Sequence, residues 1–126
     1  GHLGVGEREM ELHPADGHTP DGMALWQPRA RVLVCGDYLS PVEIPMLSEG
    51  GSVDAYLATL RRLEPLVEQA DVVVPGHGET LDSARALAIL REDRAYLEAL
   101  PDAKLPLARR DDEQRRIHER NVAALG

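Results

Sequence analysis

Apolar and polar residues alternate through the first part of the chain, and this alternation predicts strands. Within residues 7–13, Met10 and Leu12 share one face, while acidic residues and a histidine share the other. A period of two is typical of a half-buried strand. Two further apolar runs, Met23–Trp26 and Arg31–Cys35, predict the next two strands. The amino-terminal part is therefore expected to be a β-meander.

A different spacing, with apolar residues three and four positions apart, predicts a helix after these strands. Residues 39–52 contain prolines, glycines and serines, which favours a loop. Ser52 is a candidate N-cap for the helix that follows, which has one apolar face. That face consists of Val53, Tyr56, Leu57, Leu60 and Leu63. Pro65 is expected to kink this helix, or to restart it as a short second helix ending near Gln69.

One more strand and two helices complete the pattern. A β-branched run that begins at Asp71 predicts a fourth strand, and a helix capped by Asp82 or Ser83 is expected to reach about Leu100. The last helix, highly charged, is expected at residues 111–125. Its narrow inner stripe consists of Ile117 and Val122. The order β-β-β-α-β-α-α indicates an α/β fold, in which a small mixed sheet is covered by helices on one face.

Composition limits the core and the partners that the chain can have. Its 126 residues suffice for one domain or for part of a larger one. Apolar residues make up 43% but aromatic residues only 3%, with no Phe, so the core is expected to consist of Leu, Val and Ala. The formal charge of -8, from 14 Lys and Arg against 22 Asp and Glu, argues against nucleic acid and anionic membrane surfaces as partners.

The single cysteine bears on the compartment. Cys35 has no second cysteine with which to form an internal disulfide, and this favours a cytoplasmic location. No stretch approaches the roughly 20 apolar residues of a membrane-spanning helix. Gly1-His2 resembles the remnant of a tag and is set aside from the fold prediction.

Three glycine-rich strings carry side chains that could bind a metal. They are Gly17-His18-Thr19-Pro20-Asp21-Gly22, Gly36-Asp37 and Pro75-Gly76-His77-Gly78. The second and third follow apolar runs expected to be strands, and a side chain at a strand end is held firmly while it faces the rim. The imidazoles of His18 and His77 and the carboxylate of Asp37 form a donor set suited to zinc or iron. Three donors are too few for a site with two metals.

Each of these three residues also has a simpler interpretation. His18 could cap a turn, Asp37 could close an Asx-turn, and the glycines around His77 could merely form a loop. The metal interpretation is stronger for the three together, because neighbouring strands bring their ends to one edge of a sheet. A buried carboxylate at such an edge also needs a hydrogen bond, a counter-charge or a metal.

Four further residues are candidates for weaker roles around this site. Thr19 and Asp21 could orient His18 by hydrogen bonding. Tyr38, directly after the predicted carboxylate ligand, could reach the substrate or a metal-bound water, or could pack in the core. Glu43 could contact a ligand residue or the substrate, or could be exposed to solvent.

The remaining distinctive side chains are expected to be structural. His13, on the polar face of the first strand, and His118, in the charged last helix, are expected at the surface. Cys35 is expected to be a small buried apolar residue, and Trp26 a core or interface anchor. The Glu- and Arg-rich tail is expected to be a solvated face.

The three strings together resemble the carboxy-terminal half of the metallo-β-lactamase fold, and in particular its glyoxalase II-like hydrolases. The correspondence covers residues 7–80, and residues 81–126 are similar to the helical tail of that family. The resemblance implies that His18 binds a first metal, that Asp37 bridges two metals as the catalytic carboxylate, and that His77 binds the second metal. An Asp at position 37, in place of a Cys, is similar to the hydrolase and glyoxalase branch.

The resemblance also implies an activity. Two zinc ions, or two iron ions, would share an activated hydroxide that attacks a thioester or a related ester. The family's His-x-His-x-Asp-His motif, which supplies most of the other ligands, is absent from this sequence. Residues 1–126 are therefore expected to be the carboxy-terminal half of such a domain, a fragment that is inactive by itself and binds metal weakly or not at all.

A lone half of this fold would leave an apolar sheet face without its usual cover. The expected partner is the missing amino-terminal half or a second copy of this chain, besides the small-molecule substrate of the intact enzyme. The alternative is a non-catalytic half-fold that serves in assembly or binds a partner.

Overall fold

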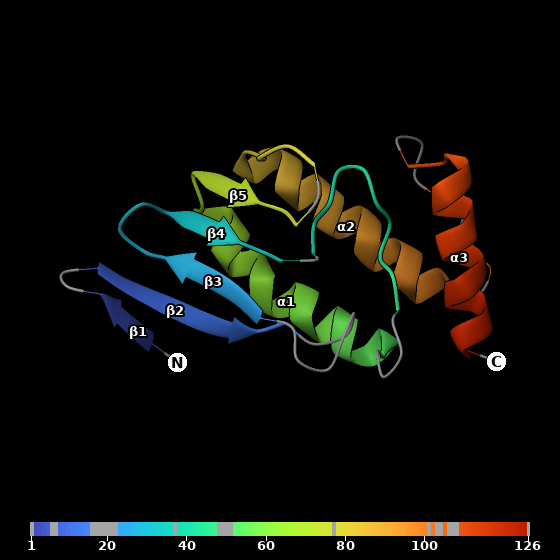
Figure 1. Ribbon diagram of the computed structural model, residues 1–126, viewed down its shortest axis with the longest axis horizontal. Helices are drawn as coiled ribbons and strands as arrows, with labels where there is room; N and C mark the ends of the chain where they lie inside the picture. Colours follow the sequence, from blue (N-terminus) through green and yellow to red (C-terminus); the bar gives the residue numbers. More distant parts are fainter. Residues whose placement is uncertain are drawn as a thin grey trace.

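A five-stranded sheet with helices on one face is the framework of the computed structural model (Figure 1). Two long helices lie behind the sheet in this view, and a third stands at the end of the molecule away from it. The structure describes residues 2–5, 8–15, 23–36, 38–47, 52–76, 78–100, 102, 105 and 109–125. This arrangement confirms the expected α/β class.

The sheet is mixed, with three antiparallel pairings and one parallel pairing. Its strands, in spatial order, are β1 (His2–Val5), β2 (Arg8–Pro14), β3 (Met23–Gln27), β4 (Val32–Val34) and β5 (Val72–Val74). Strands β2 to β5 confirm the four strands predicted from the sequence. Strand β1 is an addition to the predicted pattern: it includes His2, which the fold prediction had set aside and which pairs with Glu11 through the backbone.

The first helix, α1 (Val53–Gln69), continues through Pro65. The Ser52 hydroxyl accepts the Ala55 N–H at 3.2 Å and caps the helix, as expected. The predicted restart of the helix at Pro65 is wrong. Pro65 is exposed, so the carbonyl that loses its partner, that of Arg61, can bind water instead.

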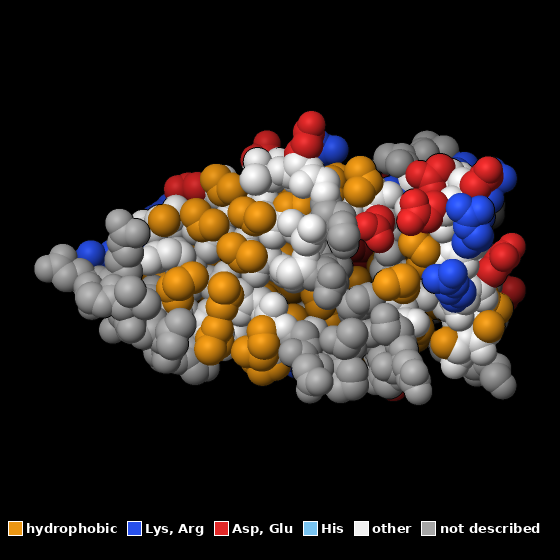
Figure 2. All heavy atoms as spheres, viewed as in Figure 1, with side chains coloured by type: hydrophobic (Ala, Val, Ile, Leu, Met, Phe, Trp, Pro, Cys, Tyr) orange, Lys and Arg blue, Asp and Glu red, His pale blue; other side chains and the backbone are white. Residues whose placement is uncertain are grey.

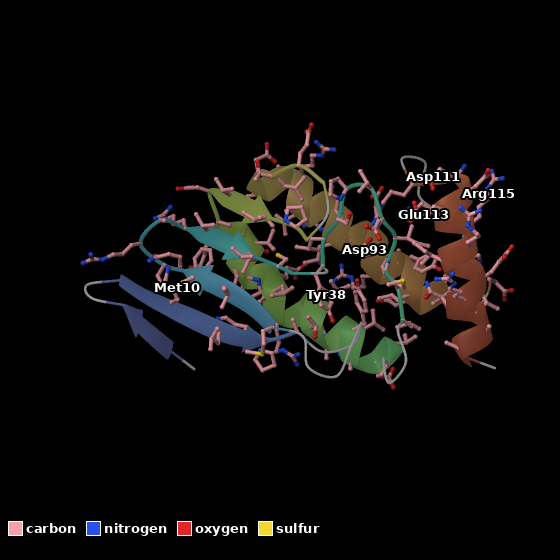
Figure 3. The ribbon with its side chains drawn as sticks, in the orientation of Figure 1. Met10, Tyr38, Asp93, Asp111, Glu113 and Arg115 are labelled. Atoms are coloured by element: carbon pink, nitrogen blue, oxygen red, sulfur yellow. The ribbon has the colours of Figure 1, made fainter. Side chains whose placement is uncertain are left out.

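The other two helices begin after acidic residues and occupy their predicted positions. Asp82 caps α2 (Ser83–Ala99) by accepting a first-turn backbone N–H at 2.8 Å. Asp111 precedes α3 (Asp112–Leu125) and accepts a first-turn N–H at 2.9 Å (Figure 3). In the part of the chain that the structure describes, no helix is long and apolar enough to span a membrane.

One face of the sheet packs on α1 and α2 and forms the core. Cross-strand neighbours Trp26, Leu33 and Val73 are almost fully buried on this covered face. The helices add Leu60, Leu63, Val67, Leu90 and Leu97 to the same buried cluster. The core is largely aliphatic, as expected, but Trp26 and three tyrosines, Tyr38, Tyr56 and Tyr96, are also buried in it as large anchors.

The opposite face of the sheet is also apolar, and no described helix covers it (Figure 1). This open face consists of Met10, Leu12, Leu25, Val32, Val34, Val72 and Val74. Figure 2 shows hydrophobic side chains gathered over these strands. Val72 at the edge is 37% exposed, which is unusual for a valine in a strand of a sheet.

Strand β2 carries its polar residues on the covered side of the sheet. Glu11 is in register with Trp26, and His13 with Ala24. The side chains of His13 and Glu11 are 28% and 30% exposed, and His13 Nε2 is 3.1 Å from Glu11 Oε1. The apolar residues of β2 therefore lie on the open face, away from α1 and α2.

A buried ion pair joins α2 to the segment before α3. Arg109 and Asp93 are each 1% exposed, and Arg109 Nη1 lies 2.7 Å from Asp93 Oδ1. Nη1 has only two protons, and it donates to the carbonyls of Ser40 at 3.3 Å and Glu43 at 2.9 Å. Among the described residues, Asp93 Oδ1 has no hydrogen-bond partner. At this short distance the Arg109 guanidinium stabilises the ionised form of the Asp93 carboxyl.

Burial raises the pKa of Asp93 from its ordinary value of 3.8 to about 7, and the Arg109 charge opposes this shift only in part. The folded protein thus holds this proton more tightly than the unfolded chain does. The resulting contribution to stability is fully present below the unfolded pKa and is lost as the pH rises through the folded pKa.

Replacing Asp93 with Asn should remove this pH dependence. We expect the free energy of unfolding of the wild type to fall relative to that of Asp93→Asn between about pH 4 and about pH 8. Urea denaturation at several pH values measures the difference, and Asp102→Asn, at an exposed position, is the matched control. A difference between wild type and Asp93→Asn that stays constant over this range would contradict the raised pKa.

Candidate metal centre

The predicted metal ligands and their helpers lie outside the described residues. This holds for His18, Asp37 and His77, and also for Thr19 and Asp21. Their assignment therefore stays a prediction. Their described neighbours nevertheless show which part of the fold each glycine-rich string borders.

The strings around Asp37 and His77 begin at neighbouring strand ends. Strands β4 and β5 are parallel, with Val34 opposite Val74. The Cys35 N–H donates to the Val74 carbonyl at 2.9 Å and extends this pairing. Positions 37 and 77 follow the matched pair at the same distance along the chain (34 to 37 and 74 to 77). The two strings therefore start together at the carboxyl ends of β4 and β5.

The string around His18 is bordered by the same edge of the sheet. Residues 15–22 connect Pro14 to Met23, which are in register at the end of β2 and the start of β3. A Cβ added to Gly36 would lie 3.4 Å from the Met23 carbonyl oxygen. The described residues next to all three strings thus lie at the same end of the sheet.

The loop of residues 38–47 also adjoins this edge. Gly78 has a φ of +97°, and an added Cβ would lie 2.7 Å from Cγ and 2.9 Å from Cδ of Pro41. Both the backbone conformation and this close approach require a glycine. The loop therefore lies directly against the residue that follows the predicted ligand His77.

Tyr38 belongs to the core. Its side chain is 2% exposed, and its ring centroid lies 4.5 Å from that of Tyr56. Its N–H donates to the Cys35 carbonyl at 3.2 Å in the turn after β4, and Figure 3 shows Tyr38 near the middle of the molecule. This arrangement supports the packing interpretation, while a role toward substrate stays a prediction.

Glu43 takes part in the loop through its backbone. Its carbonyl accepts from Arg109 at 2.9 Å, and the N–H groups of Glu43 and Val42 donate to Ser40 Oγ at 2.9 and 3.1 Å. A serine followed by Pro and, at the third position, Glu is a helix-start signature that predicts such a turn. A role for the Glu43 side chain stays a prediction.

Cys35 is a buried thiol, as expected. It is fully buried, and burial raises its pKa from 9.0 to about 12. The thiol is therefore protonated at neutral pH. Cys35 belongs to the buried hydrophobic cluster, and packing is the role that its surroundings show.

Two buried amide side chains of α3 bind the second half of the loop. Gln114 Oε1 accepts the Ile44 N–H at 2.7 Å. Asn121 Oδ1 accepts the Leu47 N–H at 2.9 Å, and its Nδ2 donates to the Pro45 carbonyl at 2.7 Å. Gln114 is 2% exposed and Asn121 is 0% exposed. The amides and the Arg109 guanidinium together satisfy backbone groups that lie outside the sheet.

The expectation that the tail is a solvated face is wrong for Gln114 and Asn121, whereas Ile117 is buried as predicted for the inner stripe of this helix. Gln114, Ile117 and Asn121 follow helical spacing and share the buried stripe of α3. The sequence does contain a signal for these hydrogen bonds, because Gln114 and Asn121 occur at the helical spacing of the inner stripe. The burial of Arg109 has no such local signal, because its partners lie as many as 69 positions away.

His118 is half-buried and bonded, which corrects its expected surface position. Its Nδ1 lies 2.7 Å from the Tyr96 hydroxyl, with the two rings edge to face. Asn121 Nδ2 donates to the same hydroxyl at 3.1 Å. Burial raises the pKa of Tyr96, so the hydroxyl stays protonated and links α2 to α3.

The donor chemistry fits a metal, although the donor set is small. Among the described residues, no group of three or more His, Cys, Asp and Glu side chains could hold a metal ion. The predicted set therefore remains His18, Asp37 and His77. Two imidazoles and a carboxylate suit zinc or iron, but they cannot enclose two ions.

Comparison with known sequences identifies the family. The family model described as Metallo-beta-lactamase superfamily matches residues 2–77. A Metallo-beta-lactamase type 2 from Bacillus sp. (strain 170) is 29% identical over 93 residues, which cover 70% of this chain and 35% of that protein.

Solved structures agree with this match. A stereoselective inverting sec-alkylsulfatase from Pseudomonas sp. is similar in fold, with a TM-score of 0.65 at 20% identity over 78% of this chain and 17% of that chain. A metallo-beta-lactamase family protein from Thermus thermophilus gives a TM-score of 0.63 at 25% identity over 79% of this chain and 35% of that chain. The chain thus spans about a third or less of the length of these relatives. Because the family model covers more than half of the sequence, the chain belongs to the metallo-β-lactamase superfamily.

Proposed function

We propose that this chain is the carboxy-terminal half of a metal-dependent hydrolase of the glyoxalase II-like type, and that it provides one wall of the active site. In this proposal the intact protein hydrolyses a thioester or a related ester. The other half supplies the remaining metal ligands, and the isolated chain is inactive. Family membership and the three glycine-rich strings support this proposal.

The observation that carries the proposal is the meeting of strand ends at one edge of the sheet. Val34 and Val74 are in parallel register, and Gly36 lies against Met23. Ligands that project from such an edge can reach a common metal although they are far apart in sequence. The relatives named above include a β-lactamase and a sulfatase, so the thioester class rests on the strings, and above all on an Asp at position 37.

The proposed roles follow from the chemistry of the side chains. His18 and His77 would each bind a metal through a neutral imidazole nitrogen, and Asp37 through its carboxylate. When bound, zinc or iron would act as a Lewis acid and make water a nucleophile at neutral pH. Thr19 and Asp21 would hydrogen-bond to His18 and hold its ring in place.

Replacing His77 with Ala in the intact protein should remove one metal and most of the activity. Loss of a direct ligand should lower kcat/KM by more than the roughly 10–100-fold that follows loss of a residue that only orients a ligand. Zinc content and thioester hydrolysis measure the two effects. His13→Ala removes a histidine to which the proposal gives no role, and it is the matched control.

Unchanged turnover in His77→Ala would show that the assignment of His77 is wrong. The intact reading frame provides a second check. A His-x-His-x-Asp-His motif about 50–100 residues before Gly1 would supply the remaining ligands. A frame that lacks the motif would overturn the enzyme proposal.

A second candidate function is a non-catalytic half-fold that acts in assembly, and the open face favours it. Apolar cross-strand neighbours Leu25, Val34 and Val74 run across this face, where no described helix packs. An exposed apolar surface of this kind usually marks an interaction site. In our proposal the amino-terminal half covers the open face in the intact protein, and a second copy of the chain covers it in the isolated fragment.

A lysine at the centre of the open face should prevent self-association of the isolated chain. We expect the wild-type chain to sediment as a dimer or a larger species, and Val34→Lys to shift this equilibrium toward monomer, because a charge cannot be buried unpaired in an apolar contact. Ala84→Lys, at an exposed position on α2, adds the same charge elsewhere and should have no effect. A wild-type chain that stays monomeric in dilute solution would contradict association through this face.

A further inference from the structure

We propose that the carboxy-terminal segment of residues 109–121 is a positioning device for the metal centre, which acts by fixing the loop of residues 38–47. This inference rests on the proposed function for the metal, while the device itself rests on contacts between described residues. Arg109, Gln114 and Asn121 are positioning residues in this scheme, since they bind the loop and are given no contact with metal or substrate.

Arg109 fixes the first half of the loop. Its Nη1 donates to the carbonyls of Ser40 and Glu43 at 3.3 and 2.9 Å. Its Nη2 donates to Glu92 Oε1 at 3.3 Å. The neighbouring Asp93 carboxyl lies 2.7 Å from Nη1 and provides a counter-charge inside the core when it is ionised. A planar guanidinium can bridge several acceptors in fixed directions, so it ties the loop to α2.

The two amides of α3 fix the second half of the loop. Gln114 binds the backbone of Ile44, and Asn121 binds that of Pro45 and Leu47. These backbone groups lie outside the strands, and α3 provides the partners that a sheet would otherwise supply. The loop is thus bound along its length by three side chains. Each of them comes 66 to 76 positions later in the sequence than the loop residue that it binds.

The orientation of Asn121 is itself determined by its surroundings. Both protons of its amide are used, one toward the Pro45 carbonyl and one toward the Tyr96 hydroxyl. The Tyr96 hydroxyl is also bonded to His118. Asn121 therefore cannot rotate without breaking hydrogen bonds to two different elements, which makes it a rigid support for the loop.

The loop also contacts the end of the sheet at which the described neighbours of positions 37 and 77 lie. At one end, Tyr38 donates to the Cys35 carbonyl in the turn just after β4. Further along, Pro41 lies so close to Gly78 that an added Cβ would be 2.7 Å from Pro41 Cγ. A displacement of the loop would therefore move the described neighbours of both predicted positions, 37 and 77.

The polar nature of these contacts is what points to positioning. Apolar side chains at positions 114 and 121 could fill the same space, but they would leave the Ile44 N–H, the Leu47 N–H and the Pro45 carbonyl without these partners. Hydrogen bonds, unlike apolar contacts, have fixed directions and therefore specify one position of the loop. A catalytic metal site needs ligands held within a narrow range of geometries, and supporting residues provide that precision.

Zinc affinity and amide hydrogen exchange of the intact protein test this inference together. Gln114→Met removes the acceptor for the Ile44 N–H while it preserves side-chain volume. We expect the Ile44 amide to exchange at least about tenfold faster, and the dissociation constant for zinc to rise about tenfold. Gln114→Glu keeps an acceptor oxygen at the same position and should restore both values toward those of the wild type.

Arg115→Met is the control, since it introduces the same methionine at an exposed position of the same helix. It should leave zinc affinity and Ile44 exchange unchanged. If Ile44 exchanges faster in Gln114→Met while zinc affinity stays the same, the loop does not position the metal and the inference is overturned. If Gln114→Met does not fold, amide exchange of the wild-type protein is the test. Ile44 and Leu47 amides that exchange as fast as those of a free peptide would show that the loop is not held, and would overturn the inference.

The failure of this inference differs from the failure of the proposed function. If the intact wild-type protein binds no zinc, the metal assignment fails and the inference fails with it. If the wild type binds zinc and the Gln114 variants bind it equally well, only the positioning role is overturned.

Discussion

The parallel pairing of β4 with β5 is the constraint on which the rest of this structure depends. Parallel strands cannot be joined by a tight turn, so the chain has to cross over between them, and α1 with the loop before it makes that crossing. The crossing lays α1 on one face of the sheet and decides which face becomes the core. The same pairing starts two glycine-rich strings side by side, after Val34 and Val74.

The strands of this sheet have the composition of strands that are covered on both faces. β4 and β5 consist of valine and leucine without polar alternation, which is typical of parallel strands buried on two sides. β2 does alternate, yet its apolar residues Met10 and Leu12 lie on the open face rather than over the helices. The helices thus account for one apolar face, and the other has the character of an interface with a second layer.

The loop of residues 38–47 shows how an irregular segment can be held as firmly as a strand. Its backbone groups are bound by Arg109, Gln114 and Asn121, each at most 2% exposed. Asp93 gives the Arg109 charge a buried partner, so α2, α3 and the loop depend on one another. The carboxy-terminal helices therefore do more than cover the sheet, because they determine where the loop beside the candidate metal centre lies.

Local sequence determined most of the elements, because periodicity and capping act over a few residues. Strands β2 to β5, the Ser52 and Asp82 caps and the aliphatic core all followed from such patterns. The three metal-capable strings were also visible in the sequence, and the family match agrees with the fold that they imply. Tertiary structure alone decided that β1 joins the sheet and that α1 passes through Pro65, since these depend on backbone pairing and solvent access. It also decided the burial of Arg109 and Asn121, because their partners in the loop lie more than sixty positions away and no local pattern encodes such contacts.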